Sequence, residues 1–204
     1  MIVHAYSTDS RERYFVPIVV GAASIAVSYA LNTWTSRYQI QIPWWLDSPT
    51  PLFLFGVIYV VYDRWLWRLP LLSRLPCLAG SWTGTVCSSH DSSVEHRATL
   101  RIRQTWSAIL IELETEHSRS VSCMANLAID GRSEPTLSYE YANEPKALST
   151  ETMQAHRGTA RLAFKGTDRV EKVLEGEYYT GRGRATIGEM HFEFQSQAKA
   201  ATRG

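Results

Sequence analysis

The chain has 204 residues and a formal net charge of +1, with 45% hydrophobic and 20% charged residues. From Cys77 onward it carries 15 Lys and Arg against 16 Asp and Glu. Nucleic-acid-binding surfaces are usually basic, so this balance argues against a nucleic-acid polymer as partner but leaves room for a local cationic pocket. Cys77, Cys87 and Cys123 are odd in number and lack metal-ligand spacing, which argues against both a disulfide framework and a metal site.

Two apolar segments of membrane length lie in the first third of the chain. Residues 14–31 contain no charge and would span roughly 27 Å as a helix, close to the thickness of the hydrocarbon core. Residues 52–69 are apolar and aromatic but include Asp63 and Arg64. A cleaved signal peptide fits the first segment poorly, because the apolar run is longer than a signal peptide uses and no small-residue cleavage site follows. A signal anchor or buried core helices are the remaining alternatives. The pattern predicts a two-helix transmembrane hairpin over residues 1–76.

Basic residues flank the two segments on the same side. Arg11 and Arg13 precede the first segment, Arg68 and Arg74 follow the second, and the connector has only Arg37. The positive-inside rule therefore predicts a multi-pass membrane protein with cytoplasmic N- and C-termini.

Residues 77–194 have the composition of short strands separated by turns. Pro70 and Pro76 end the second helix before this region begins. In residues 96–104 the apolar Ala98, Leu100 and Ile102 alternate with polar residues, as expected of strands with one buried face. The predicted strands are residues 81–87, 96–104, 107–115, 119–129, 136–143, 157–165, 173–179 and 184–194. Eight such strands favour a small antiparallel β-barrel, with a β-sandwich as the alternative, and residues 195–204 are expected to be disordered.

The sequence lacks the spacing of any common catalytic motif. There is no P-loop, nucleophile elbow or zinc-protease helix, and the six histidines are scattered. Glu112, Glu114 and Glu116 share one face of a strand, and the simplest interpretation is that this face is exposed to solvent. We therefore expect no catalytic residues, no metal and no cofactor.

Aromatic and basic side chains of the predicted barrel could bind a ligand that has both bases and phosphates. Arginine forks bind phosphate oxygens, and aromatic rings stack on bases. The candidate ligand-binding residues are Arg103, Trp106, Tyr139, Tyr141, His156, Tyr178, Tyr179, Arg182 and Arg184. Packing in the barrel or exposure in a turn explains each of them equally simply.

The order of these features resembles the two-transmembrane β-barrel effectors of CBASS, the cyclic-oligonucleotide-based anti-phage defence of bacteria. The resemblance covers nearly the whole chain and rests on the two apolar segments followed by GSWTG at 80–84, LSYEY at 137–141, HRGTA at 156–160, LEGEYY at 174–179 and GRGR at 181–184. It implies that the barrel binds a cyclic dinucleotide made by a partner nucleotidyltransferase (a CD-NTase). It also implies that the protein lies in the bacterial inner membrane, forms a homo-oligomer there and disrupts this lipid bilayer.

Two questions stay open: the role of Asp63 and Arg64, and the kind of ligand that the barrel binds. Asp63 and Arg64 could lie at the cytoplasmic membrane boundary, or they could pair between protomers or line a hydrated defect when the hairpins cluster. There are two alternatives to the nucleotide receptor. One is a membrane-tethered, lipocalin-like barrel that binds a lipid or other apolar ligand, and the other is a scaffold with a filled interior. A cavity with arginines would favour a nucleotide, and one lined only by Leu, Ile and Phe would favour a lipid.

Overall fold

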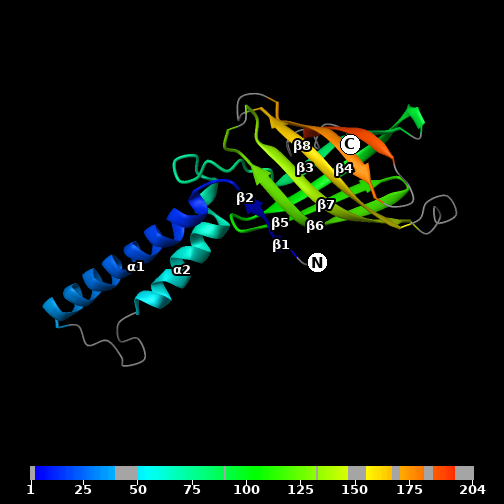
Figure 1. Ribbon diagram of the computed structural model, residues 1–204. Helices are drawn as coiled ribbons and strands as arrows, with labels where there is room; N and C mark the ends of the chain where they lie inside the picture. Colours follow the sequence, from blue (N-terminus) through cyan, green and yellow to red (C-terminus); the bar gives the residue numbers. More distant parts are fainter. Residues whose placement is uncertain are drawn as a thin grey trace, which may run out of the picture. The chain divides into compact units, whose positions relative to one another are not determined.

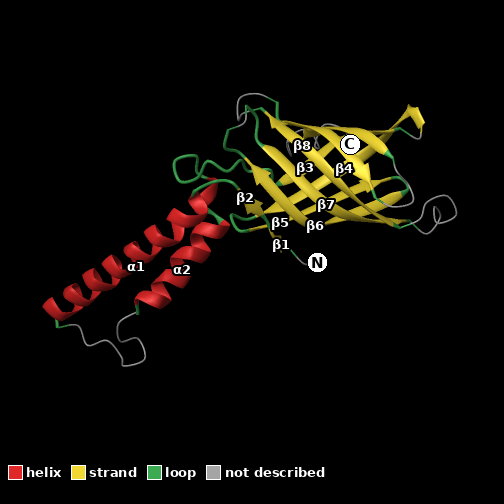
Figure 2. Cartoon of the chain, viewed as in Figure 1, coloured by secondary structure: helices red, strands yellow, loops and turns green. Residues whose placement is uncertain are grey.

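The computed structural model describes residues 3–39, 50–89, 91–131, 133–146, 155–166, 171–181 and 186–195. The chain forms two compact units (Figure 2). One is helical and contains Ser10–Leu75. The other consists of strands and contains Met1–Asp9 together with Pro76–Gly204.

The helical unit contains α1 (Glu12–Arg37), α2 (Pro51–Arg64) and a short 3₁₀ helix at Leu66–Arg68. Within the described part of the chain, α1 is the helix that is long and apolar enough to cross a membrane. The second predicted segment, residues 52–69, is α-helical only as far as Arg64. Its 14 helical residues rise about 21 Å.

The two helices pack through small side chains of α1. Val20, Ser24 and Ser28 are its buried residues, spaced four apart on one face, and Tyr62 is the buried residue of α2. The hydroxyl of Ser24 donates to the carbonyl of Val20 at 2.6 Å, so its polar group is satisfied inside the helix. Small residues allow close approach of helix backbones in a membrane, where apolar side chains gain nothing by leaving lipid.

Eight strands of the second unit close into an antiparallel barrel, as predicted (Figure 1). They are β3 (Gly80–Ser88), β4 (Asp91–Gln104), β5 (Ala108–Thr115), β6 (Ser118–Ala128), β7 (Thr136–Pro145), β8 (His156–Lys165), β9 (Val173–Thr180) and β10 (Ile187–Phe194). Each strand pairs with its neighbours in the chain, and β10 pairs with β3. Closure gives every strand two partners and removes the exposed edges of an open sheet. The β-sandwich alternative is thereby excluded.

Aromatic side chains fill one end of the barrel, which we call the base. Trp82 is fully buried there, and its indole N–H donates to the carbonyl of Leu78 at 3.0 Å. The rings of Phe164 and Phe194 meet Trp82 edge to face at centroid distances of 6.3 and 5.0 Å. The other end, which we call the mouth, is where β3 ends and β4 begins.

The seam between β5 and β6 is paired at only a few positions. The two strands are in register at Glu112–Val121, Leu113–Ser120 and Glu114–Arg119, near the mouth. Toward the base they separate, and the N-terminal strands β1 (His4–Ala5) and β2 (Ser7–Thr8) occupy the gap (Figure 1). β1 pairs antiparallel with β5, and β2 pairs parallel with β6.

This N-terminal strap, residues 3–9, is anchored by side chains as well as by pairing. Tyr6 is 6% exposed, and the Asp9 carboxylate accepts hydrogen bonds from the backbone N–H groups of Ile129 and Asp130. The Ser122 hydroxyl lies at the fork, 2.7 Å from His4 Nε2 and 3.0 Å from the Ile111 nitrogen, which donates to it. The strap was not predicted from the sequence, which assigned residues 1–76 to the membrane part as a whole.

Candidate functional site

A cavity of about 140 Å³ lies in the mouth of the barrel. All eight barrel strands or the turns beside them contribute to it, so its shape depends on barrel closure. The residues that line this mouth cavity are Val86, Ser88, His96, Leu113, Thr115, His117, Ser118, Ser120, Tyr141, Asn143, His156, Tyr178, Thr180, Thr186 and Met190.

Most residues that line the mouth cavity carry a polar group, beside the apolar Val86, Leu113 and Met190, but few of them can be charged. Among the described lining residues there is no Lys, Arg, Asp or Glu, and the polar groups are hydroxyls, one amide, two phenols and three imidazoles. The imidazoles belong to His96 on β4, His117 in the turn between β5 and β6, and His156 on β8. The rings of His96 and His117 lie edge to face with centroids 6.2 Å apart.

Two tyrosines of the cavity each lie against a glycine on the neighbouring strand. Tyr141 is in register with Gly158, and Tyr178 with Gly188. A Cβ atom at Gly158 would lie 2.4 Å from the Tyr141 hydroxyl, and one at Gly188 would lie 2.2 Å from the Tyr178 ring. Real Cβ atoms do not approach so closely, so the absence of a side chain at each glycine leaves room for the ring.

Tyr139 lies one inward position below Tyr141 on β7, with ring centroids 6.1 Å apart. Its side chain is buried, and no partner within the described residues accepts or donates a hydrogen bond to its hydroxyl. Burial, together with the nearby Tyr141, raises the pKa of the Tyr139 phenol above its usual value, so it stays protonated. Tyr139 itself does not line the mouth cavity but packs beside Tyr141, which does.

The structure brings together three of the nine predicted ligand-binding residues: Tyr141, His156 and Tyr178. Arg103 lies on the outer face of β4 and pairs with Glu112 at 3.1 Å, while Tyr179 is 42% exposed on the outer face of β9. Trp106 is 1% exposed in the turn that follows β4, away from the mouth. Arg182 and Arg184 lie outside the described residues.

Sequence reasoning missed His96, His117 and Asn143 as cavity residues. A signal for His96 was present, because it has the same parity as the inward Ala98 and Leu100 of β4. The same argument applies to His156, which is two residues from the inward position Gly158 on β8 and therefore faces the same side. His117 lies in a turn, where alternation carries no information about direction.

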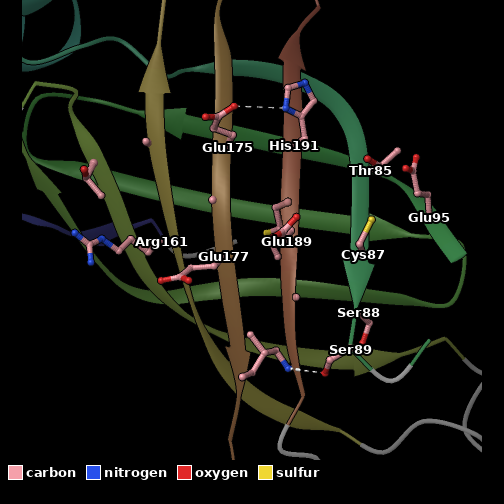
Figure 3. Close-up of a pocket in the computed structure, with 16 residues that line it drawn as sticks. Thr85, Cys87, Ser88, Ser89, Glu95, Arg161, Glu175, Glu177, Glu189 and His191 are labelled. Carbon is pink, nitrogen blue, oxygen red and sulfur yellow. Dashed lines mark hydrogen bonds and ion pairs between the residues drawn. The ribbon is translucent and has the colours of Figure 1, made fainter. Parts of the chain in front are cut away.

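A larger hollow lies on the outer wall of the barrel, over β3, β9 and β10 (Figure 3). Glu175, Glu177 and Glu189 line it, and only His191 and Arg161 among its described residues can carry positive charge. Glu177 and Glu189 are directly opposite in register, an arrangement of like charges that is unfavourable in an antiparallel pair. This acidic wall repels a ligand with anionic phosphates, so the mouth cavity is the better candidate site for such a ligand.

The predicted membrane-effector pair, Asp63 and Arg64, occupies the last two positions of α2. Asp63 is half-buried and Arg64 exposed within the helical unit. The described part of the chain contains no cluster of three or more His, Cys, Asp or Glu side chains that could hold a metal ion.

Comparison with known proteins connects both units to one family. Residues 73–193 match the family described as Cap15, cyclic dinucleotide receptor domain, and residues 15–68 match Cap15, TM helices. A CD-NTase-associated protein 15 of Yersinia aleksiciae is 30% identical over 192 residues, covering 87% of this chain and 88% of the relative. One of Staphylococcus schleiferi is 28% identical over 139 residues, covering 67% and 72%. The chain belongs to the Cap15 family of CBASS effectors, which combine transmembrane helices with a cyclic dinucleotide receptor domain.

Proposed function

We propose that the barrel mouth binds a cyclic dinucleotide made by a CD-NTase, and that binding drives the protein to oligomerise in the bacterial inner membrane and disrupt it. The relatives are named for association with a CD-NTase, which supports that source of the ligand. In this proposal the protein acts by binding and assembly, with no chemical step of its own.

The observation that carries the proposal is the position and lining of the mouth cavity. It lies inside the region that matches the cyclic dinucleotide receptor domain, and it combines aromatic rings with hydrogen-bonding groups. Its 140 Å³ is below the roughly 300–1,000 Å³ of typical ligand pockets. The mouth therefore takes one part of the dinucleotide, such as a base and its phosphate, and the rest extends beyond the described rim.

The lining argues against the apolar-ligand alternative. A lipid would need a deep channel of aliphatic side chains, whereas this cavity is small, has only Val86, Leu113 and Met190 as aliphatic members of its described lining, and ends above the Trp82 cluster that fills the base. The lining also differs from the predicted arginine-rich site. Arg182 and Arg184 remain in the proposal because they lie in the sequence between Thr180 and Thr186, which both line the mouth cavity.

The membrane half of the proposal rests on the helical unit. Ligand can promote assembly only if it binds the assembled state more tightly than the resting state. A cytosolic ligand also requires a cytosolic barrel, and the arginine flanks favour cytoplasmic termini of a multi-pass protein. Asp63 and Arg64, at the end of α2, are the proposed polar contacts between clustered helices.

Binding is tested with full-length protein in lipid nanodiscs and a panel of cyclic di-AMP, cyclic di-GMP and cyclic GMP–AMP. Tyr178→Leu should weaken binding roughly 5- to 150-fold, because it removes a ring worth about 1–3 kcal/mol for each stacked base. The matched control is Tyr179→Leu, one position along the same strand but on the outer face, which should bind like wild type. Equal affinity in all three proteins would remove the mouth from the proposal.

Membrane disruption is tested with dye-loaded liposomes that contain the full-length protein. Dye should escape only in the presence of a cyclic dinucleotide that the protein binds, and the Tyr178→Leu variant should need a higher concentration of this ligand for the same release. Replacing Asp63 and Arg64 with Leu should reduce release without reducing ligand binding. Equal leakage with and without ligand would contradict a ligand-gated effector.

A further inference from the structure

A phosphodiester ligand in the mouth cavity needs positive charge or strong hydrogen-bond donors, because an uncompensated anion is costly to take out of water. Among the described lining residues, only His96, His117 and His156 can carry positive charge. They come from three separate elements and converge on one rim, two of them half-buried and His117 exposed. Half of the six histidines of the chain thus surround one small cavity.

Hydroxyl groups complete the same rim. The Thr180 and Thr186 hydroxyls lie 2.8 Å apart, and those of Thr115 and Ser118 lie 3.2 Å apart. Each pair joins neighbouring parts of the barrel and faces the mouth cavity. Such groups can donate to phosphate oxygens but cannot neutralise them, so the histidines are the charge-bearing members of the described rim.

We propose that His96, His117 and His156 bind a phosphodiester group of the ligand in their imidazolium forms, so that binding takes up protons and tightens as the pH falls toward about 6. This inference rests on the proposed binding of a cyclic dinucleotide at the mouth. A nearby anion favours the charged imidazole, and reciprocally the charged imidazole favours the anion.

Other ionisable groups near the rim do not supply this ligand-dependent change. Glu95 and Glu116 are exposed beside His96 and His117, and Tyr141 and Tyr178 are the phenols of the lining. Of the other charged neighbours on the adjoining strands, Lys146 and Arg101 pair with Glu114, Arg157 pairs with Glu140 and Arg119 with Glu112, while Arg97 and Glu144 are exposed. Phosphodiesters do not titrate near neutral pH, and histidine is the residue type of the described rim whose ordinary pKa lies in that range.

The test is calorimetry on full-length protein in nanodiscs, using the tightest binder among cyclic di-AMP, cyclic di-GMP and cyclic GMP–AMP. Titrations in PIPES and Tris at one pH measure proton uptake from the difference in apparent enthalpy. We expect net uptake near pH 7 and an affinity that rises about tenfold from pH 8 to pH 6.

The triple variant His96→Gln, His117→Gln, His156→Gln keeps hydrogen-bonding groups but cannot become charged. It should bind about tenfold more weakly at pH 6 and show no pH dependence. His191→Gln, on the acidic outer wall, is the control and should behave like wild type. If the triple variant does not fold, the wild-type proton count and the three single variants still decide the question.

Two failures are distinguishable. Wild-type binding without proton uptake and with a flat affinity from pH 6 to pH 8 would overturn the histidine proposal and leave the proposed function intact. Failure of every cyclic dinucleotide in the panel to bind at any of these pH values would overturn both.

Discussion

Two glycines determine how the cavity tyrosines lie. The Tyr178 ring covers the backbone of β10 at Gly188, and Tyr141 does the same at Gly158 on β8. Glycine in a strand weakens it unless something uses the space, and here an aromatic ring on the paired strand does so. The cavity is therefore shaped as much by missing side chains as by those present.

The first prediction follows from this contact. Gly188→Ala should lower the free energy of unfolding by about 1–3 kcal/mol, because its Cβ would meet both the Tyr178 ring and the Cys87 carbonyl oxygen, at 2.2 and 2.1 Å. It should also weaken ligand binding by displacing the ring. Chemical denaturation and calorimetry measure the two effects. Gly181→Ala, whose nearest neighbour would be 3.2 Å away, is the milder control, and a Gly188→Ala protein as stable as this control would contradict the close approach.

At the scale of elements, a buried carboxylate reinforces the poorly paired seam between β5 and β6. Glu112 on β5 is 7% exposed and binds Arg103 of β4 and Arg119 of β6, so it joins three adjacent strands. Burial opposes its ionisation, but the hydrogen bonds and charges of Arg119 and Arg103 outweigh this and hold the pKa of the Glu112 carboxyl below its usual value. The row of glutamates expected to be a solvated face is thus not uniform, because Glu112 is buried while Glu114 is partly exposed.

A pH-dependent prediction follows for Glu112→Gln. A carboxyl whose folded pKa is depressed stabilises the protein above its unfolded pKa, about 4.3, and this contribution disappears as the pH falls through the folded value. At pH 7 we expect Glu112→Gln to cost about 1.5–3 kcal/mol in the free energy of unfolding. The difference from wild type should shrink below about pH 4. Urea denaturation at several pH values checks this, and a difference that stays constant into acid would assign the effect to packing alone.

The strap is the second element-scale feature, and it makes the barrel unit discontinuous in sequence. Removing the first residues would leave the edges of β5 and β6 without partners near the base. Tyr6→Ala should therefore destabilise the barrel by about 2–4 kcal/mol, since it empties a buried aromatic site in the strap. Val3→Ala, in the same strap but exposed, is the control. Equal stability of the two variants by thermal denaturation would show that the strap does not contribute to the fold.

At the scale of the whole molecule, orientation decides whether the proposed ligand can reach the barrel. A reporter fused after Gly204 should be active only as a cytoplasmic fusion, and one inserted near Gln41 only as a periplasmic fusion, because the arginines flank the helices on the terminal side. Both sites lie outside the described residues. The reverse pattern would place the barrel outside the cytoplasm and contradict a cytosolic second messenger as ligand.

Strand composition interrupted by turns was sufficient to locate the eight strands, and alternation supported this in β4 and β8, where one buried face imposes a period of two. The length and the absence of charge in residues 14–31 were likewise sufficient to predict α1, because an apolar run of membrane length can be recognised without knowing which segments pack against it. The order of these parts also led to the family that the comparisons confirm.

Only the tertiary structure decided which residues meet. The strands β1 and β2 are two residues each, too short to show a period, and they exist because β5 and β6 separate near the base. The hairpin of β4 and β5 brings His96 and His117 together, but His156, on β8, joins them around the mouth cavity only in the closed barrel. Composition and local pattern are properties of single segments, and they were enough to determine the fold class. The candidate site depends on which side chains meet in the cavity, and this is decided by strand register across the closed barrel.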